Sequence, residues 1–395
     1  MESDSRSPMR LYDTARGEIV PFRPGQMVSL YTCGITPYDA THLGHACTYV
    51  TFDVLQRRLI DRGHLVRYVR NITDVDDDML AASRQRGIHH LDLAFGETRR
   101  FDEDMAALGN LVPWAEPRAS GAIPAIRSFI HELLDGGLAY RSGDAVFFDV
   151  TSSEVFGSLS HLSEIEMRFR GEEMGEDLED SRKHNPLDPV LWKSSAVDEP
   201  AWDAPWGRGR PGWHVECAAM AVTQLGPTVD LHGGGSDLIH PHHDCSSAMA
   251  SAVTGESLSR HWMHQAMVRN QGMKMSKSLD NLVFVSDLLA RVDPMALRLS
   301  LLVNHYRTSW DWEPDILLTA EERLDRWRLA SSGDGNHSLE AVRKALDNDL
   351  DVRMAVAAID EAATEGRGVR QAARLLGVDV SDRGTKASGR SGGDR

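Results

Sequence analysis

One strand–helix–strand succession near the N-terminus constrains the fold of this 395-residue chain more than any other feature. Met27–Cys33 reads as a short strand, Leu43–Arg62 as a long helix with an apolar stripe, and Leu65–Arg70 as a second strand. Basic residues crowd the last turn of the helix, where they complement its dipole, and Gly63 is well placed to end it. This succession, about 45 residues long, is typical of a βαβ unit, so we expect parallel strands and an α/β fold.

Farther along the chain, strand and helix patterns continue around one irregular segment. Residues 75–140 are expected to be largely helical, and the pattern is lost between Arg168 and Asp188, where the acidic segment Glu172–Asp180 reads as a surface loop. Strands are expected at Asp144–Val150 and Val229–His232, and helices at Trp213–Leu225, Asp244–Val253, Asp287–Val292 and from Pro294 to about His305. Ser331–Asn336 reads as a linker.

The composition narrows the functional classes. Lys and Arg total 43 against 59 Asp and Glu, a net charge of −16, which disfavours a broad electrostatic grip on nucleic acid or an anionic membrane. The N-terminus is polar and no long uncharged apolar run occurs, so we expect a cytoplasmic protein without membrane contact. The four cysteines are too few for a disulfide framework and favour metal ligation or burial: Cys33, Cys47, Cys217 and Cys245.

Two short motifs suggest phosphate chemistry. Thr41–His45 lies where the first strand hands over to its helix, a position at which open parallel sheets bind nucleotides, and Gly44 lets a ligand approach the backbone. Lys274–Ser278 places two lysines and two serines in a loop that could neutralise a triphosphate. Taken singly, the histidines also fit capping or core roles, and the lysines a solvated basic loop. The two motifs in this order are a much stronger signal than either alone.

Both motifs resemble the ATP-binding signatures of class I aminoacyl-tRNA synthetases. More closely, four further segments resemble cysteinyl-tRNA synthetases and their paralogues, the cysteine ligases of mycothiol biosynthesis: Tyr31–Asp39, Asn71–Asp77, Pro211–Cys217 and His232–Asp237. The resemblance extends from about Leu11 to Glu313. It implies an α/β, Rossmann-like parallel-sheet catalytic domain over residues 1–285 with a connective insertion at about 110–200, and a helical region over 286–375. The residues after that, 376–395, are rich in Ser, Gly, Arg and Asp, and this composition predicts a disordered tail.

The resemblance also implies one Zn²⁺ per chain, bound by Cys33, Cys217 and His242. Three protein ligands leave a fourth tetrahedral position open, and soft thiolate–zinc bonding distinguishes cysteine from the nearly isosteric serine. His243 and Cys245 are expected to lie beside the site. The spacing of these residues would not by itself reveal a metal site.

The remaining site residues also follow from the resemblance. His42, His45, Lys274 and Lys277 are expected to act in catalysis with ATP and Mg²⁺. Contacts with cysteine and the adenylate are implied for Cys33, Gly34, Ile35, Thr36, Thr48, Asn71, Ile72, Thr73, Trp213, Gly235, Ser236, Asp237, Val268 and Lys277. Core packing of the apolar members and ordinary turn chemistry of the glycines are the alternative interpretations.

Three features favour the mycothiol-type ligases over the tRNA enzymes. The segment Tyr38–Ala46 resembles the ligase version, Ser246 stands where the tRNA enzymes commonly have a glutamate, and the chain after residue 336 is too short for a full anticodon-binding domain. The expected reaction joins L-cysteine to glucosaminyl-inositol through cysteinyl-AMP, in a monomer that does not bind tRNA. Arg170–Asp177 departs from the Arg-Gly-Gly-Asp-Pro segment of the ligases. A cysteinyl-tRNA synthetase, or a ligase that loads another amine, therefore stays open as an alternative.

Overall fold

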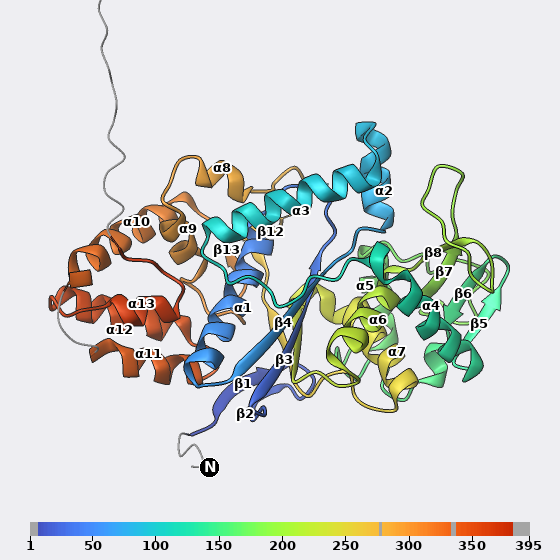
Figure 1. Ribbon diagram of the computed structural model, residues 1–395, viewed down its shortest axis with the longest axis horizontal. Coiled ribbons are helices and arrows are strands. Elements are labelled where there is room, and N and C mark those ends of the chain that lie inside the picture. The colour runs from blue at the N-terminus through green and yellow to red at the C-terminus, as the bar shows by residue number, and fades with distance from the viewer. Residues whose placement is uncertain (1–6, 276–278, 333–336, 382–395) are drawn as a thin grey trace, which may run out of the picture.

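A four-stranded parallel sheet forms the centre of the computed structural model, which describes residues 7–275, 279–332 and 337–381 (Figure 1). The strand order is β10-β9-β3-β4, and every neighbouring pair is parallel. The expected strand–helix–strand unit is confirmed, with α1 connecting β3 to β4. The bounds are β3 Met27–Ile35, α1 Leu43–Asp61, β4 Leu65–Ile72, β9 Leu231–Gly235 and β10 Trp262–Gln265.

The order of the strands creates a change of direction beside β3. The chain passes from β3 to β4 on one side and later returns to place β9 on the other side of β3. In open parallel sheets, the crevice at the carboxyl ends of such strands is the usual place for a ligand. The segments that follow β3, β4 and β9 therefore meet at one edge of the sheet.

Helix α1 is fixed at both ends by its own sequence. The His42 side chain accepts a hydrogen bond from Gly44 N at the start of the helix, and Gly63, with φ 94°, follows its end as predicted. Most of the helix is buried, because the sheet and the C-terminal helices pack around it. Arg58 is buried as well, and it is neutralised by Asp61 and Asp347.

An insertion separates β4 from the second half of the central sheet. The helical stretch expected at residues 75–140 is confirmed as three helices, α2 Asp77–Arg86, α3 His90–Ala107 and α4 Ala119–Asp135. An antiparallel sheet follows, in the order β5-β6-β7-β8, with bounds Ala139–Ser142, Ala145–Phe148, Val190–Ser194 and Gly209–Pro211. In Figure 1 this sheet and the C-terminal helices lie on opposite sides of the central sheet.

The segment from residue 168 to residue 188 differs in part from the prediction. Helix α5 spans Glu164–Glu173, so the first part of the supposed loop is helical. A capping box between Ser163 and Glu166 begins this helix, and that signal is visible in the sequence. The segment after Met174 contains no helix or strand up to β7.

Helices α6 (Trp213–Leu225) and α7 (Asp244–Thr254) agree with the prediction, and both pack with α4 in a second hydrophobic core. The hairpin β1 (Met9–Asp13) and β2 (Glu18–Phe22) precedes the central sheet. A small sheet in the order β12-β11-β13 contains Lys274, the first residue of the lysine motif, with bounds Met273–Lys274, Val268–Asn270 and Trp310–Asp311.

The C-terminal region is helical and packs against α1. Its helices are α8 Val285–Leu289, α9 Pro294–Leu301, α10 Pro314–Leu329, α11 His337–Asp347, α12 Val352–Thr364 and α13 Arg370–Leu375. Helix α8 begins before the predicted Ser286 cap, and α9 ends before His305. The predicted disordered tail begins too early, because Val378 and Val380 are buried in the core. None of the helices in the described ranges is long and apolar enough to cross a membrane.

Candidate active site

The two histidines of the first motif lie together where β3 leads into α1. Their rings stack with centroids 3.8 Å apart. Burial, followed by the nearby charges of His45 and Lys274, lowers the pKa of His42 to about 2, so this imidazole is neutral at physiological pH. A neutral imidazole can donate a hydrogen bond to phosphate oxygen without adding a charge.

Lys274, the first residue of the lysine motif, lies at the same edge of the sheet. Lys274 ends β12, and its Nζ lies 3.0 Å from Asp237 Oδ2, just beyond the end of β9. Both side chains are partly exposed. The structure thus brings a member of the second ATP motif to the predicted ribose-binding segment and near His42. The predicted Lys277 lies outside the described residues.

Gly34 and Asn71 interlock the ends of β3 and β4. The backbone N–H of Gly34 donates to Asn71 Oδ1 at 2.9 Å, and Asn71 Nδ2 donates to Thr73 Oγ1 at 3.0 Å. A Cβ atom at Gly34 would stand 1.5 Å from the carbonyl oxygen of Asn71, so no larger residue fits this backbone. These contacts hold the ends of β3 and β4 together beside Cys33.

The other predicted contact residues divide into two groups. The side chains of Ile35, Ile72 and Val268 are buried, which agrees with a packing role. The partly exposed residues are Thr36, Trp213, Gly235, Ser236 and Asp237. Thr48 donates to Gly44 O at 3.1 Å and so stabilises the first turn of α1.

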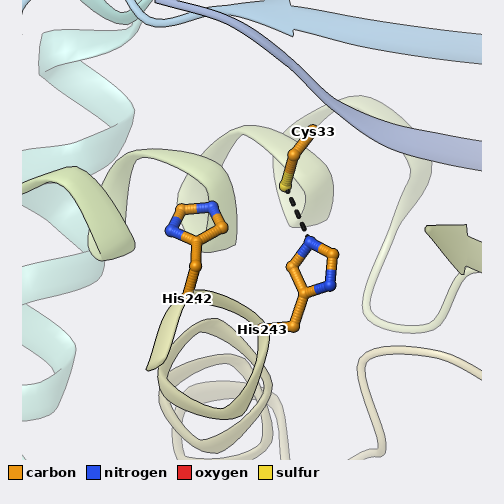
Figure 2. Close-up of side chains that lie close together, drawn as sticks. All are labelled: Cys33, His242 and His243. Atoms are coloured by element: carbon orange, nitrogen blue, oxygen red, sulfur yellow. Dashed lines mark hydrogen bonds between the residues drawn. The ribbon is translucent and has the colours of Figure 1, made fainter. Parts of the chain in front are cut away.

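A buried group of potential metal ligands lies at the base of this edge. Figure 2 shows Cys33, His242 and His243, whose candidate ligand atoms lie within 4.8 Å of one another. Cys33 Sγ is 3.1 Å from His243 Nε2 and 3.8 Å from Cys217 Sγ. Cys217 is nevertheless not a member of the group, so the structure brings the predicted Cys33 and His242 together and places Cys217 beside Cys33 only.

His214 and Glu176 form a hydrogen-bonded chain that ends at Nδ1 of His242. His242 Nδ1 is 2.8 Å from His214 Nδ1, and His214 Nε2 is 2.8 Å from Glu176 Oε1. His242 Nε2 is buried and has no hydrogen-bond partner in the described part of the chain. Trp213 stacks on the His242 ring, with centroids 4.1 Å apart.

His243 has a similar support on its other side. Its Nδ1 is 2.8 Å from His264 Nε2, and His264 Nδ1 is 2.7 Å from Thr14 Oγ1. Both nitrogens of His243 are therefore engaged. His264 and Glu176 were not predicted from the sequence as supporting residues. His264 has no motif around it, and Glu176 lies in a segment that reads only as acidic surface.

Burial sets the protonation states of this group. It raises the pKa of the Cys33 thiol well above its ordinary value, with hydrogen bonding to Cys217 adding to the effect. Desolvation lowers the pKa of His242 and His243 far below the usual value. The group is neutral without a cation, and a bound metal would displace the thiol proton.

Comparison with known proteins finds similarity over most of the chain. Residues 19–322 match the family model of the tRNA synthetases class I (C) catalytic domain. The L-cysteine:1D-myo-inositol 2-amino-2-deoxy-alpha-D-glucopyranoside ligase of Nakamurella multipartita is 46% identical, covering 94% of this chain and 95% of the relative. The ligase of the same name from Thermobispora bispora is 47% identical, covering 91% of each chain.

Solved structures agree on the fold. Mycobacterium tuberculosis methionyl-tRNA synthetase in complex with methionyl-adenylate has a TM-score of 0.64 and 16% identity, covering 90% of this chain and 88% of that one. A putative arginyl-tRNA synthetase from Campylobacter jejuni has a TM-score of 0.59 and 11% identity, with 90% and 93% coverage. At these identities the likeness concerns the fold, and it confirms the predicted class I synthetase architecture.

Proposed function

Because the chain belongs to the family of L-cysteine:1D-myo-inositol 2-amino-2-deoxy-alpha-D-glucopyranoside ligases, we propose that it joins the carboxyl group of L-cysteine to the amine of glucosaminyl-inositol in mycothiol biosynthesis. The observation that carries the proposal is the near full-length similarity to these ligases, together with the ATP motifs and the cysteine-histidine group at one edge of the sheet. The cysteinyl-tRNA synthetase alternative is not favoured by the curated relatives.

In the first proposed step, a carboxylate oxygen of cysteine attacks the α-phosphorus of ATP. The bond from that phosphorus to the bridging oxygen breaks, and pyrophosphate leaves. Mg²⁺ bound to the phosphates would neutralise part of their charge. His42 and His45 are proposed to donate hydrogen bonds to the phosphates. Lys274 and Lys277 are proposed to neutralise the charge that develops on pyrophosphate.

The proposed adenylate site uses the segments after β3, β4 and β9. The ribose is assigned to Gly235, Ser236 and Asp237, and the backbone at Val268 to the adenine side. The cysteine and adenylate contacts extend over Cys33, Gly34, Ile35, Thr36, Thr48, Asn71, Ile72, Thr73 and Trp213. The convergence of these segments supports the assignment, because the carboxyl ends of parallel strands meet at one edge.

We propose that Cys33, Cys217 and His242 hold one Zn²⁺, with His243 hydrogen-bonded to Cys33. Two thiolates on a tetrahedral zinc ion stand about 3.8 Å apart when each Zn–S bond is about 2.3 Å, and the Cys33 and Cys217 sulfurs are 3.8 Å apart. The buried, unpartnered Nε2 of His242 supports its role as the nitrogen ligand. Cys217 or His242 must shift to complete this set. A zinc ion there would bind the substrate thiol as thiolate and so exclude serine.

In the second proposed step, the amine of glucosaminyl-inositol attacks the carbonyl carbon of cysteinyl-AMP. The carbon–oxygen bond to phosphate breaks, AMP leaves, and the amine gives up one proton to water as the amide forms. We propose that the enzyme acts as a monomer in the cytoplasm and does not use tRNA. The free state of Cys33, Cys47, Cys217 and Cys245 is consistent with a reducing compartment.

Cysteine-dependent exchange of pyrophosphate into ATP tests the first step and its amino-acid specificity. The wild-type protein is expected to catalyse exchange with L-cysteine and not with L-serine. Zinc analysis of C33S and C217A tests the metal, since each is expected to lose bound zinc and exchange together. C47A is the matched control, because Cys47 is buried in α1 and contacts Leu301 O instead of the metal group. Wild-type zinc content in both site variants would exclude the proposed ligands.

A further inference from the structure

The segment after α5 carries one carboxylate, Glu176, that is linked through His214 to the candidate metal group. Glu176 Oε1 lies 2.8 Å from His214 Nε2, and the Glu176 side chain is 23% exposed. Lys183, whose side chain is only 3% exposed, has its Nζ 4.0 Å from the other carboxylate oxygen. The neighbouring Glu172 and Glu179 are exposed. Glu176 is therefore set apart from the other acidic residues of its segment by its direction and its partners.

These contacts determine which nitrogen of each ring carries hydrogen. An ionised carboxylate can only accept, so His214 Nε2 carries the hydrogen that Glu176 accepts. With its single N–H placed at Nε2, His214 has Nδ1 left as an acceptor. His242 Nδ1, 2.8 Å away, must then donate to it. His242 Nε2 is left with a free lone pair, and this is the buried atom that lacks a hydrogen-bond partner in the described part of the chain.

We propose that Glu176 is a positioning residue that acts through His214 to hold His242 in the tautomer whose Nε2 can bind a metal ion. The inference rests on the proposed metal site. The acidic segment after α5 then has a specific role, since it supplies the carboxylate that orients His242. The proposed metal ligands themselves come from other parts of the chain. Groups that orient metal-bound histidines typically change metal affinity by 10–100-fold when they are removed.

Two substitutions of Glu176 distinguish the effect of its hydrogen bond from the effect of its side-chain volume. E176M keeps the length of the side chain and removes the acceptor, whereas E176Q keeps an amide oxygen that can accept the same hydrogen. Zinc affinity is measured by competition with a chelator of known affinity on the purified full chain, and KM for cysteine and kcat are measured by pyrophosphate exchange. E179A is the matched control from the same segment.

E176M is expected to weaken zinc binding by about 10–100-fold and to raise KM for cysteine, while E176Q and E179A stay within about threefold of the wild-type protein. Zinc affinity of E176M within threefold of the wild type would overturn the inference. An equal loss in E176Q would also overturn it, because the acceptor would then be unimportant. If the wild-type protein itself binds no zinc, the proposed metal site fails, which is a different result from wild-type zinc binding that Glu176 does not affect.

Discussion

Replacing Lys274 by alanine should separate catalysis from stability. Lys274 and Asp237 are 49% and 32% exposed, and an ion pair of this kind contributes at most about 1 kcal/mol to the free energy of unfolding. A group that stabilises charge only in the transition state contributes about 2.7–4 kcal/mol to the reaction, or 10²–10³ in rate. We therefore expect K274A to fold normally and to lose at least about a hundredfold in adenylation rate, with little change in KM for cysteine.

The assay is cysteine-dependent pyrophosphate exchange, with the melting temperature measured on the same samples. R269A is the control, because Arg269 forms a similar pair with Asp311 at 3.2 Å, with side chains 40% and 33% exposed, on the strand next to Lys274. Both variants should melt within about 2–4 °C of the wild-type protein, and only K274A should lose exchange activity. Equal losses of exchange in the two variants, or nearly normal exchange in K274A, would refute the assignment of Lys274 to the transition state.

Three further changes test the framework of the site. G34A should cost about 3 kcal/mol and abolish exchange, because its Cβ would overlap Asn71 O; urea unfolding with normal stability would contradict this. R298M should lower the free energy of unfolding by about 3 kcal/mol, because the buried carbonyl oxygens of Leu108 and Leu376 lose their donor and Asp53 keeps only Arg57 as a cationic partner. Burial raises the pKa of Asp104 to about 6, so its ionisation costs stability as pH rises above about 4. D104N should raise the melting temperature at pH 7 and have little effect at pH 4; the same gain at both values would contradict this.

The central fold could be predicted because its signals are local. The apolar stripe of α1, the His42 cap and Gly63 mark one helix between two strands without reference to the rest of the chain. The order β10-β9-β3-β4 is different, since it depends on contacts between strands far apart in sequence. The predicted ends of some helices and the predicted start of the tail differ from the structure by a few residues for the same reason. Packing decides where ordered structure continues, as the burial of Val378 shows.

The candidate site was only partly visible in the sequence. The ATP motifs are compact, and resemblance supplied Cys33, Cys217 and His242, which are too far apart for a spacing rule. Glu176 reaches His214 from a segment with no helical or strand period, so periodicity could not place it. His264 has no distinguishing neighbours in the sequence, and only the parallel pairing of β10 with β9 brings it beside His243.

The identity of the acceptor tests the central claim most directly. Mass spectrometry should be used to identify the products formed from the purified protein, L-cysteine, ATP and Mg²⁺ when glucosaminyl-inositol and total tRNA are supplied together. The amide of cysteine with glucosaminyl-inositol is the predicted product, with AMP and pyrophosphate released in equal amounts. Cysteine attached to tRNA, with no amide formed, would contradict the proposed function and move the chain to the tRNA-charging enzymes.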